Sequence, residues 1–341
     1  MGEDRYHRQT LIPDIGAQGR RRLADASVLL VGCGALGSVS ADLLARAGIG
    51  RIRLVDRDIV ELTNLQRQVL YAESDLGAPK ATAARGRLGA VNGEIDIESF
   101  VEDVDASNIE RLAEGCTVII DGLDNFETRY LVNDLAVSTD RPWFYGGAVG
   151  TTGMSAVVIP GRTPCLRCTF PEPPAAGTSP TCDTAGVLGP VIHMVAAHQA
   201  MQAIKLLSGN TDAVDFRLHS FDAWGNTRHA MDHGLPRTDC PCCGEHDFPW
   251  LDGRRESSTS VLCGRDAVQI KPAAAGDSIE LQALAERLAE HGDFHCSDEV
   301  LRGRLHEVDV ELTVFADGRA LIKGASTPEQ ARTVYARYIG T

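Results

Sequence analysis

Residues 28–37 constrain the fold of this chain more than any other stretch. Four apolar residues, Val28 to Val31, are followed by Gly32, Gly34 and Gly37. A short apolar run bounded by glycine is typical of a strand buried on both faces of a parallel sheet. The next residues are apolar at helical spacing, namely Leu36, Val39, Leu43, Leu44 and Ala47. We therefore predict a strand, a tight glycine turn and a helix in immediate succession.

This arrangement is typical of a phosphate-binding site. The first N–H groups of the helix and the positive end of its dipole point toward an anion. The glycines let the backbone approach that ligand closely. Residues 51–56 are predicted to form the next parallel strand, which ends at Asp56, where a dinucleotide fold places an acid on the ribose hydroxyls. To this point NAD(P) and ATP fit equally well.

The polar residues that follow separate the two nucleotides. A nicotinamide dehydrogenase does not need cations just past the ribose acid, whereas an enzyme that handles a triphosphate uses them to neutralise phosphoryl oxygens. The alternative is an ordinary polar loop. The set favours a triphosphate and consists of Asp58, Asn64, Gln66, Arg67, Gln68 and, after a glycine–proline turn, Lys80.

Two carboxylates follow a later strand. Residues 95–101 and 116–121 are predicted strands, with helices at 79–91 and 105–113. Asp121 and Asp124 therefore stand at the carboxyl end of a parallel strand, where such sheets bind ligands. A carboxylate beside a triphosphate usually holds magnesium. A helix begins near Asn125, for which Asp124 could equally be only an N-cap.

Composition narrows the class of protein. The 341 residues suit two domains, and the formal charge of −14 argues against non-specific nucleic-acid binding. No apolar run is long enough for a membrane span, and the first residues do not resemble a signal peptide. The ten cysteines are therefore expected to be metal ligands or reactive thiols of a reducing cytoplasm.

The motifs together resemble the ubiquitin-activating superfamily, specifically the bacterial adenylyltransferases of thiamine and molybdopterin synthesis, the ThiF and MoeB types. The resemblance covers about residues 5–250. It rests on the order and spacing of Arg5-Tyr6-x-Arg8-Gln9, Gly32-x-Gly34-x-x-Gly37, Asp56-x-Asp58, Asn64-Leu65-Gln66-Arg67-Gln68, Gly77-x-Pro79-Lys80 and Asp121-Gly122-x-Asp124-Asn125.

The resemblance implies a role for each of these positions. The three glycines border the phosphates of ATP, Asp56 holds the ribose, and Asp124 carries Mg²⁺ as the most critical carboxylate. Arg8 resembles an arginine finger that reaches the active site of the other subunit of a homodimer. Asn64, Arg67 and Lys80 stabilise the phosphates during attack, and Asp58 and Gln68 are further nucleotide-binding residues.

The cysteines form two Cys-x-x-Cys pairs, Cys165 with Cys168 and Cys240 with Cys243. Two such pairs make a closed thiolate site for structural Zn²⁺, although the gap between them is far longer than in a zinc ribbon. The family has the same pairing. Cys242 is taken as a non-ligand because the spacing needs its neighbours. We expect a fold clamp that ties a late hairpin to the main sheet.

Cys182 follows a proline-rich segment, 171–180, predicted to be a flexible crossover loop. A thiol before a helix N-terminus is well placed for thiolate chemistry. In the family this cysteine can join the activated C-terminus of the partner protein. After it, residues 187–208 are a predicted helix with Val191, Val195, Met201, Ile204 and Leu207 facing inward, and 214–231 a closing hairpin.

Residues 256–341 are predicted to form a small α+β domain beyond an adenylation domain of residues 1–250. A strand over 260–270, two helices and two or three further strands are expected there. Cys263 is expected to be a buried strand cysteine rather than a reactive one. The predicted fold is α/β, a Rossmann-like doubly wound sheet, parallel first and antiparallel later, with this domain as a docking site for the protein substrate or a downstream acceptor.

The resemblance thus implies ATP-dependent adenylation of the C-terminal glycine of a small ubiquitin-like sulfur carrier protein ending in Gly-Gly, for thiamine or molybdopterin synthesis. A sulfurtransferase is a further candidate partner. The alternatives are activation for protein conjugation through a cysteine thioester, a nicotinamide oxidoreductase and a catalytically silent scaffold. The filled charged positions disfavour the scaffold.

Overall fold

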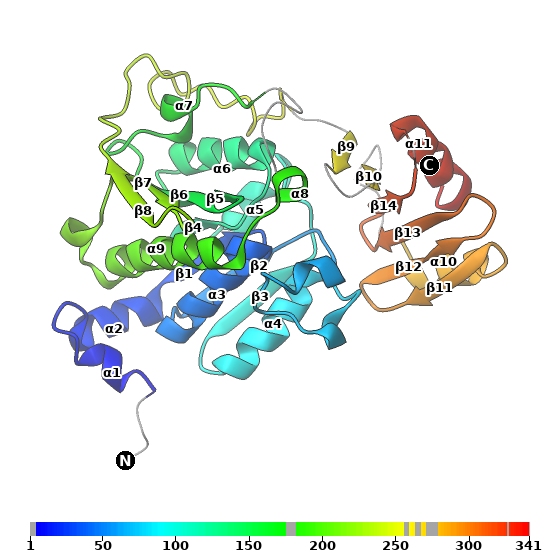
Figure 1. The fold of residues 1–341 in the computed structure, drawn as a ribbon, viewed down its shortest axis with the longest axis horizontal. Coiled ribbons are helices and arrows are strands. Elements are labelled where there is room, and N and C mark those ends of the chain that lie inside the picture. Colours follow the sequence, from blue (N-terminus) through cyan, green and yellow to red (C-terminus); the bar gives the residue numbers. More distant parts are fainter. Residues whose placement is uncertain are drawn as a thin grey trace. The chain divides into compact units, whose positions relative to one another are not determined.

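The computed structural model describes residues 5–174, 182–255, 259–262, 267–270, 279–325 and 327–340. The chain divides into two compact units (Figure 1). One unit comprises Met1–Leu76 and Lys80–Arg255, and the other comprises Gly77–Pro79 and Glu256–Thr341. Each unit has hydrophobic clusters of its own.

The first unit is built on an eight-stranded sheet with the order β3-β2-β1-β4-β5-β6-β7-β8. The first five of these strands run parallel to one another, and β6 to β8 continue antiparallel, as the sequence predicts. Their bounds are β1 (Ser27–Val31), β2 (Arg51–Val55), β3 (Asp96–Phe100), β4 (Val118–Asp121), β5 (Trp143–Val149), β6 (Thr152–Val158), β7 (Leu218–Asp222) and β8 (Thr227–Met231).

Helices cover both faces of this sheet because β1 is apolar on both sides. Val28 and Leu30 pack in a cluster with α3, α4 and α9, whereas Leu29 and Val31 pack with α5 and α6. The helices of this unit are α1 (His7–Thr10), α2 (Gly16–Asp25), α3 (Ala35–Ala47), α4 (Lys80–Val91), α5 (Ile109–Ala113), α6 (Phe126–Ser138), α7 (Leu166–Thr169), α8 (Cys182–Ala185) and α9 (Gly189–Ser208), with short 3₁₀ turns at η1 (Leu62–Asn64), η2 (Glu73–Asp75) and η3 (Thr211–Ala213).

One alternative is excluded and one local expectation is wrong. Asn125 caps α6 by accepting the N–H of Thr128 at 2.9 Å, so Asp124 is not the cap. Met201 is 51% exposed rather than inward. The buried stripe of α9 repeats at intervals of four through Val191 and Val195, and position 201 falls on the opposite side of the helix.

The second unit is a six-stranded antiparallel sheet of order β11-β12-β13-β14-β10-β9, with two helices packed in its hydrophobic cluster. The strand expected over 260–270 is instead two antiparallel strands, β9 and β10, and Cys263 lies outside the described residues. The bounds are β9 (Thr259–Leu262), β10 (Ala267–Ile270), α10 (Leu281–Leu288), β11 (Gly292–Cys296), β12 (Val300–Leu305), β13 (Val310–Phe315), β14 (Ala320–Lys323) and α11 (Pro328–Tyr338).

No helix among the described residues is both long and apolar enough to cross a lipid bilayer.

Candidate active site

The glycine turn between β1 and α3 is held by close backbone packing. Gly32 has a φ of 89°, and a Cβ there would lie 2.6 Å from the carbonyl oxygen of Gly122, at the end of β4. A Cβ on Gly37 would lie 1.9 Å from the carbonyl oxygen of Gly32. Both positions therefore require glycine for the fold itself.

Gly34 differs from these two glycines. A Cβ there would meet its nearest neighbours, Gly122 and Gln68, only at 3.8 and 3.9 Å, which are ordinary van der Waals separations. The packing of the chain thus leaves room for a methyl group at Gly34. That open space is what close approach of a ligand to this part of the backbone would need.

Asp56 fixes the same turn from the end of β2. One carboxylate oxygen accepts the backbone N–H of Cys33 at 2.6 Å, and the other accepts the N–H of Asp58 at 2.7 Å. Burial raises the pKa of Asp56, and the nearby charge of Lys80 opposes that rise. A buried carboxylate at this position is therefore supported by a cation and by backbone donors.

Lys80, the first residue of α4, is only 2% exposed. Its ammonium group lies 3.0 Å from the carboxylate of Asp58. The hydroxyl of Tyr71 donates to the backbone carbonyl of Cys33 at 2.7 Å and to that of Lys80 at 3.3 Å. The lysine is thus held beside the glycine turn from two sides.

The segment from Asn64 to Gln68 lies beside the turn. Asn64 is buried, and its side-chain oxygen accepts the N–H of Glu61 at 3.0 Å. Arg67 is half-buried and donates to the carbonyl of Thr63 at 2.8 Å. Gln68 is 3% exposed, and its amide oxygen has no hydrogen-bond partner in the described structure. A buried amide lacking a bond next to Gly34 fits a site that a polar ligand completes.

The two carboxylates after β4 have different surroundings. Asp121 is fully buried, lies 3.0 Å from Arg129 of α6 and accepts the N–H of Leu123 at 2.8 Å. Burial raises the pKa of Asp121, although Arg129 opposes the rise. Asp124 is exposed. Of this pair, Asp124 is therefore the carboxylate accessible to a metal ion from solvent.

Sequence reasoning did not identify two arginines at this edge of the sheet. Arg129 is buried and donates to the carbonyls of Leu123 and Gly146 at 2.6 and 2.9 Å. Arg57 lies 3.0 Å from Asp103; burial lowers its pKa, but neighbouring carboxylates including Asp124 outweigh this effect and raise it. The position of Arg57 between the two acids of the Asp56-x-Asp58 motif is the one signal that could have identified it.

Arg8, one of the expected site residues, is not brought to the turn. Arg8 lies on α1, which contacts the C-terminal end of α3 through Gln9 and the carbonyl of Arg46, 3.3 Å apart. Because α3 has 13 residues, this end is about 20 Å from the glycine turn. Cys182 begins α8, and its side chain lies outside the described part of the chain.

The four paired cysteines are brought together. Their Sγ atoms all lie within 4.8 Å of one another, with Cys165 at 3.7 Å from Cys240 and Cys168 at 3.3 Å from Cys243. A tetrahedral zinc ion with Zn–S bonds of about 2.3 Å requires sulfurs roughly 3.8 Å apart. The cluster is therefore compatible with zinc.

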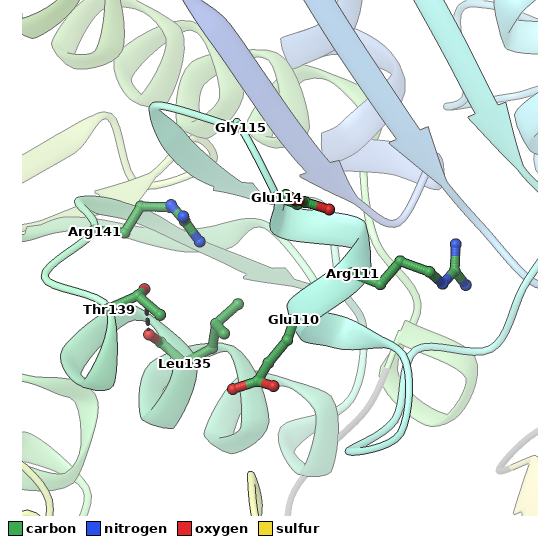
Figure 2. Close-up of a pocket in the computed structure, with 7 residues that line it drawn as sticks. All are labelled: Glu110, Arg111, Glu114, Gly115, Leu135, Thr139 and Arg141. Atoms are coloured by element: carbon green, nitrogen blue, oxygen red, sulfur yellow. Dashed lines mark hydrogen bonds between the residues drawn. The ribbon is translucent and has the colours of Figure 1, made fainter.

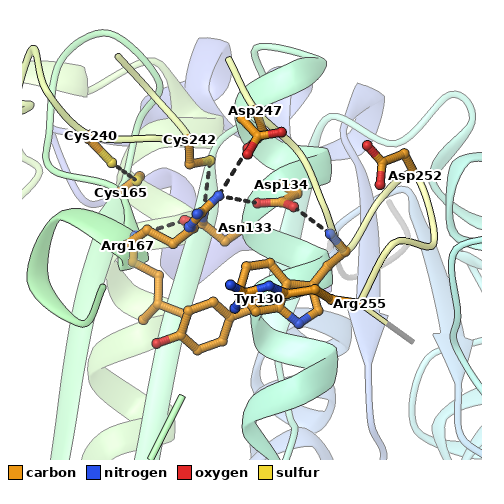
Figure 3. Close-up of polar contacts among 12 residues, drawn as sticks. Tyr130, Asn133, Asp134, Cys165, Arg167, Cys240, Cys242, Asp247, Asp252 and Arg255 are labelled. Atoms are coloured by element: carbon orange, nitrogen blue, oxygen red, sulfur yellow. Dashed lines mark hydrogen bonds and ion pairs between the residues drawn. The ribbon is translucent and has the colours of Figure 1, made fainter. Parts of the chain in front are cut away.

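Cys242 is buried, and Figure 3 shows it hydrogen-bonded to Asn133. Its sulfur accepts the side-chain N–H of Asn133 at 3.2 Å, and Asn133 in turn accepts the N–H of Leu166 at 2.7 Å. Asp134, the next residue, accepts the N–H of Trp250 at 3.1 Å. These contacts attach both cysteine-bearing segments to α6.

A hollow between α5 and the C-terminal end of α6 is a separate feature (Figure 2). It is lined by side chains of both charge signs and contains none of the expected site residues. Its lining consists of Glu110, Arg111, Glu114, Gly115, Leu135, Thr139 and Arg141.

A half-parallel sheet with a glycine turn, a buried acid and a buried lysine at one edge defines a nucleotide-binding protein of the Rossmann-like class. Residues 6–242 match the ThiF family. The chain belongs to the ThiF family.

The relatives are consistent with that assignment. The chain is 41% identical to the sulfur carrier protein ThiS adenylyltransferase of Bacillus subtilis, over 98% of this chain and 99% of that protein. It is 39% identical to the SAMP-activating enzyme E1 of Haloferax volcanii, over 71% of this chain and 89% of that protein. The crystal structure of E. coli MccB with succinimide superposes with a TM-score of 0.62 at 25% identity, covering 71% of this chain and 74% of that one.

Proposed function

We propose that this adenylyltransferase activates the C-terminal glycine carboxylate of a small ubiquitin-like sulfur carrier protein of the ThiS or MoaD type. The observation that carries the proposal is the similarity to a ThiS adenylyltransferase, which extends over both units of the chain. ATP use is supported by the adenylyltransferase relatives. An adenylyltransferase assignment also sets aside the nicotinamide oxidoreductase and the silent scaffold.

In the proposed reaction a carboxylate oxygen of the carrier attacks the α-phosphorus of ATP. The bond from that phosphorus to the bridging oxygen breaks, pyrophosphate leaves, and an acyl-adenylate forms. A C-terminal carboxylate is already ionised at neutral pH, so no side chain has to remove a proton. The protein contributes position and charge stabilisation.

The proposed roles follow the positions of the residues. The backbone at Gly32, Gly34 and Gly37 borders the phosphates, and Asp56 binds the ribose. Asp58 keeps Lys80 in place, and Asp124 would hold a Mg²⁺ ion, which supplies positive charge to the phosphate oxygens. Support comes from the space at Gly34, the buried amide of Gln68 and the accessible carboxylate of Asp124. The remaining polar contacts to the phosphates are assigned to Asn64, Arg67 and Gln68.

Zn²⁺ bound by Cys165, Cys168, Cys240 and Cys243 is proposed as a structural clamp. The sulfur separations fit a tetrahedral site, and all four protein ligands would be thiolates, so no position remains for a substrate. Such a site would fasten the segment after β8 to the segment after β6.

The active form is proposed to be a homodimer in which Arg8 serves the partner's site. The helix that carries Arg8, α1, contacts the C-terminal end of α3, which is about 20 Å from the glycine turn of the same chain, far beyond the reach of an arginine side chain. Leu11 and Ile12, which follow α1, are 66% and 46% exposed and offer an apolar surface to a second copy.

Cys182 is proposed to take part after adenylation, either in sulfur transfer with a sulfurtransferase or through a thioester. The second possibility is the alternative function, activation for protein conjugation. It is favoured by the similarity to a protein named a SAMP-activating enzyme. The two outcomes differ in whether the carrier leaves as a thiocarboxylate or joined to another protein.

The unit formed by residues 256–341 is proposed to dock the carrier protein or a downstream acceptor. Its hydrophobic cluster is separate from those of the first unit, so each unit has a core of its own. Deleting residues 256–341 should weaken carrier binding and leave ATP binding intact. Equal carrier affinity of the truncated chain would contradict this role.

Mass spectrometry of carrier proteins tests the function. The full chain is incubated with ATP, Mg²⁺ and a candidate ThiS-type or MoaD-type carrier. Formation of an adenylated carrier C-terminus is expected with one of them. A carrier that lacks its last glycine is the control. Absence of an adenylate with every such carrier, while the chain still binds ATP, would overturn the proposal.

A further inference from the structure

We propose that Tyr6 is the positioning residue for Arg8: it fixes α1 on the ends of α3 and α4 so that Arg8 is presented to the nucleotide site of a second copy of the chain. This inference rests on the proposed function, since it concerns how the arginine of one subunit reaches the reaction in the other.

Tyr6 is the one buried residue in the segment 5–14, with 6% of its surface exposed. Its hydroxyl accepts the side-chain N–H of Asn92 at 2.7 Å, and Asn92 also donates to the carbonyl of Ala45 at 2.7 Å. The guanidinium carbon of Arg20 lies 3.7 Å from the centre of the tyrosine ring. The ring is therefore held by a hydrogen bond at its edge and a cation on its face.

Gly48 makes room for the ring. It ends α3 in the left-handed conformation, with a φ of 79°. A Cβ on Gly48 would lie 2.4 Å from the tyrosine ring. Arg20 donates to the carbonyl of Gly48 at 2.9 Å, so the same guanidinium group contacts both the tyrosine ring and the notch at Gly48 that receives it. The space that Tyr6 occupies exists only because residue 48 has no side chain.

The backbone of Tyr6 also begins α1. Its carbonyl accepts the N–H groups of Gln9 and Thr10 at 2.9 and 3.1 Å. The helix has four residues and none of them is buried. A helix this short is not stable alone, so its position depends on contacts at its ends. Tyr6 supplies the buried contact, two residues before Arg8.

The helices that receive Tyr6 are those that start at the nucleotide site. α3 begins just after the glycine turn and ends at Gly48, while α4 begins with Lys80 and ends just before Asn92. Tyr6 thus attaches α1 to the C-terminal ends of α3 and α4, the two helices whose N-terminal ends lie at the nucleotide site of the same chain. Arg8 is given a fixed position relative to these helices but can act only in another subunit.

A double-mutant cycle tests the proposal, with ATP–pyrophosphate exchange measured in the presence of the carrier. Tyr6→Ala is expected to lower exchange by the same factor as Arg8→Ala, and the double variant to be no slower than Arg8→Ala alone. Protection of the chain by ATP against thermal unfolding should be unchanged in all three. Multiplied losses, or lost ATP protection, would show a general structural role and overturn the proposal.

Two further variants sharpen the cycle. Tyr6→Phe retains the ring and its contact with Arg20, so it should recover most of the exchange lost in Tyr6→Ala. Gly48→Ala should reproduce the loss by filling the notch from the other side. Full exchange in Gly48→Ala with Tyr6 displaced would contradict the assignment.

Subunit mixing distinguishes this inference from the proposed function. Tyr6→Ala and Asp124→Ala chains, each deficient in exchange, are mixed; a mixed dimer has one site with both an intact Asp124 and a well-placed arginine. Random pairing of a two-fold dimer should restore about one quarter of wild-type exchange. No restoration overturns the role in a second copy. If wild-type chains with carrier show no exchange at all, the proposed function fails instead.

Discussion

The carbonyl oxygen of Gly122 lies 2.6 Å from the point that a Cβ on Gly32 would occupy. The reverse substitution is worse, because a Cβ on Gly122 would lie 2.1 Å from the carbonyl oxygen of Gly32. Strands β1 and β4 thus meet backbone to backbone where they end. Glycine at these positions is required by packing before any ligand is considered.

Gly37→Ala should destabilise the chain more than Gly34→Ala does. Helix propensity alone would make alanine at position 37 more stabilising than glycine by about 1 kcal/mol. A lower free energy of unfolding in Gly37→Ala would therefore have to come from the 1.9 Å clash with the carbonyl oxygen of Gly32. Urea unfolding measures the difference. Gly34→Ala should unfold like wild type yet show weaker thermal protection by ATP. Equal stability of the two variants would contradict the packing argument.

Asp58→Asn should be strongly destabilising. It leaves the ammonium of Lys80, 2% exposed, without its 3.0 Å partner, and breaking a buried pair costs on the order of 3 kcal/mol. The double variant Asp58→Asn/Lys80→Met removes the charge that would be stranded. It should regain most of the stability in urea while remaining inactive in exchange. A double variant less stable than Asp58→Asn would contradict the pairing.

Substitution of Asp121 should affect stability, whereas substitution of Asp124 should affect activity. Asp121→Asn weakens a buried pair with Arg129 and should lower the free energy of unfolding by several kcal/mol. Asp124→Asn, at an exposed position, should leave stability within about 0.5 kcal/mol of wild type but abolish ATP–pyrophosphate exchange. Retained exchange in Asp124→Asn would refute the proposed magnesium ligand.

Cys243→Ser should lose bound zinc, whereas its neighbour Cys242→Ser should retain it. Cys243 lies 3.3 Å from Cys168 in the cluster, while Cys242 accepts a hydrogen bond from Asn133. Metal analysis of the purified variants gives the zinc content per chain. Loss of zinc from Cys242→Ser with retention in Cys243→Ser would reverse the ligand assignment. Absence of zinc from the wild-type protein would contradict the proposed zinc site altogether.

Acid should weaken the fold partly through His198. Burial, together with the neighbouring charge of His219, lowers the pKa of His198 to about 4 from an ordinary 6.5. The folded chain therefore binds fewer protons than the unfolded chain between these values. The stabilising contribution is complete above pH 6.5 and is lost as the pH falls toward 4. His198→Gln should accordingly lose less stability than wild type between pH 7 and pH 5, measured by urea unfolding; identical pH slopes would contradict this.

His198 packs among polar and aromatic side chains, and its burial there is the main reason why its neutral form is favoured. The ring nitrogens face Ser155 at 3.1 Å and Gln202 at 3.2 Å, and the ring centre lies 4.2 Å from that of His219. Other charged groups that act on it are Arg228, Asp215 and Lys205.

Four of the five parallel strands, β1 to β4, could be predicted, because β1 and β4 are short apolar runs and β2 and β3 alternate polar and apolar residues, whereas β5 was not predicted. Residues 28–31 and 116–121 are examples, and the change to antiparallel strands was also expected. Helix α9 was placed correctly, but Met201 was not, since an apolar residue on an amphipathic helix need not follow the buried stripe. Strands β9 and β10 were predicted as one strand, although Gly264 between them is a residue that favours a break.

The site was predicted less completely where contacts join distant parts of the chain. Nothing local to Asp121 indicates that Arg129 neutralises it, and nothing local to Tyr6 indicates that Gly48 and Asn92 receive its ring. These pairings depend on how helices end against one another. The cysteine cluster was accessible to prediction because Cys-x-x-Cys spacing is a local pattern.

The separation of Arg8 from the glycine turn by the length of α3 has a kinetic consequence. On the proposed assignment a single chain carries both the nucleotide site and Arg8, but it cannot bring them together. Dilution that splits dimers would then lower the turnover per chain, and the total rate would scale with the square of enzyme concentration in that range. The specific activity of such an enzyme therefore depends on its own concentration.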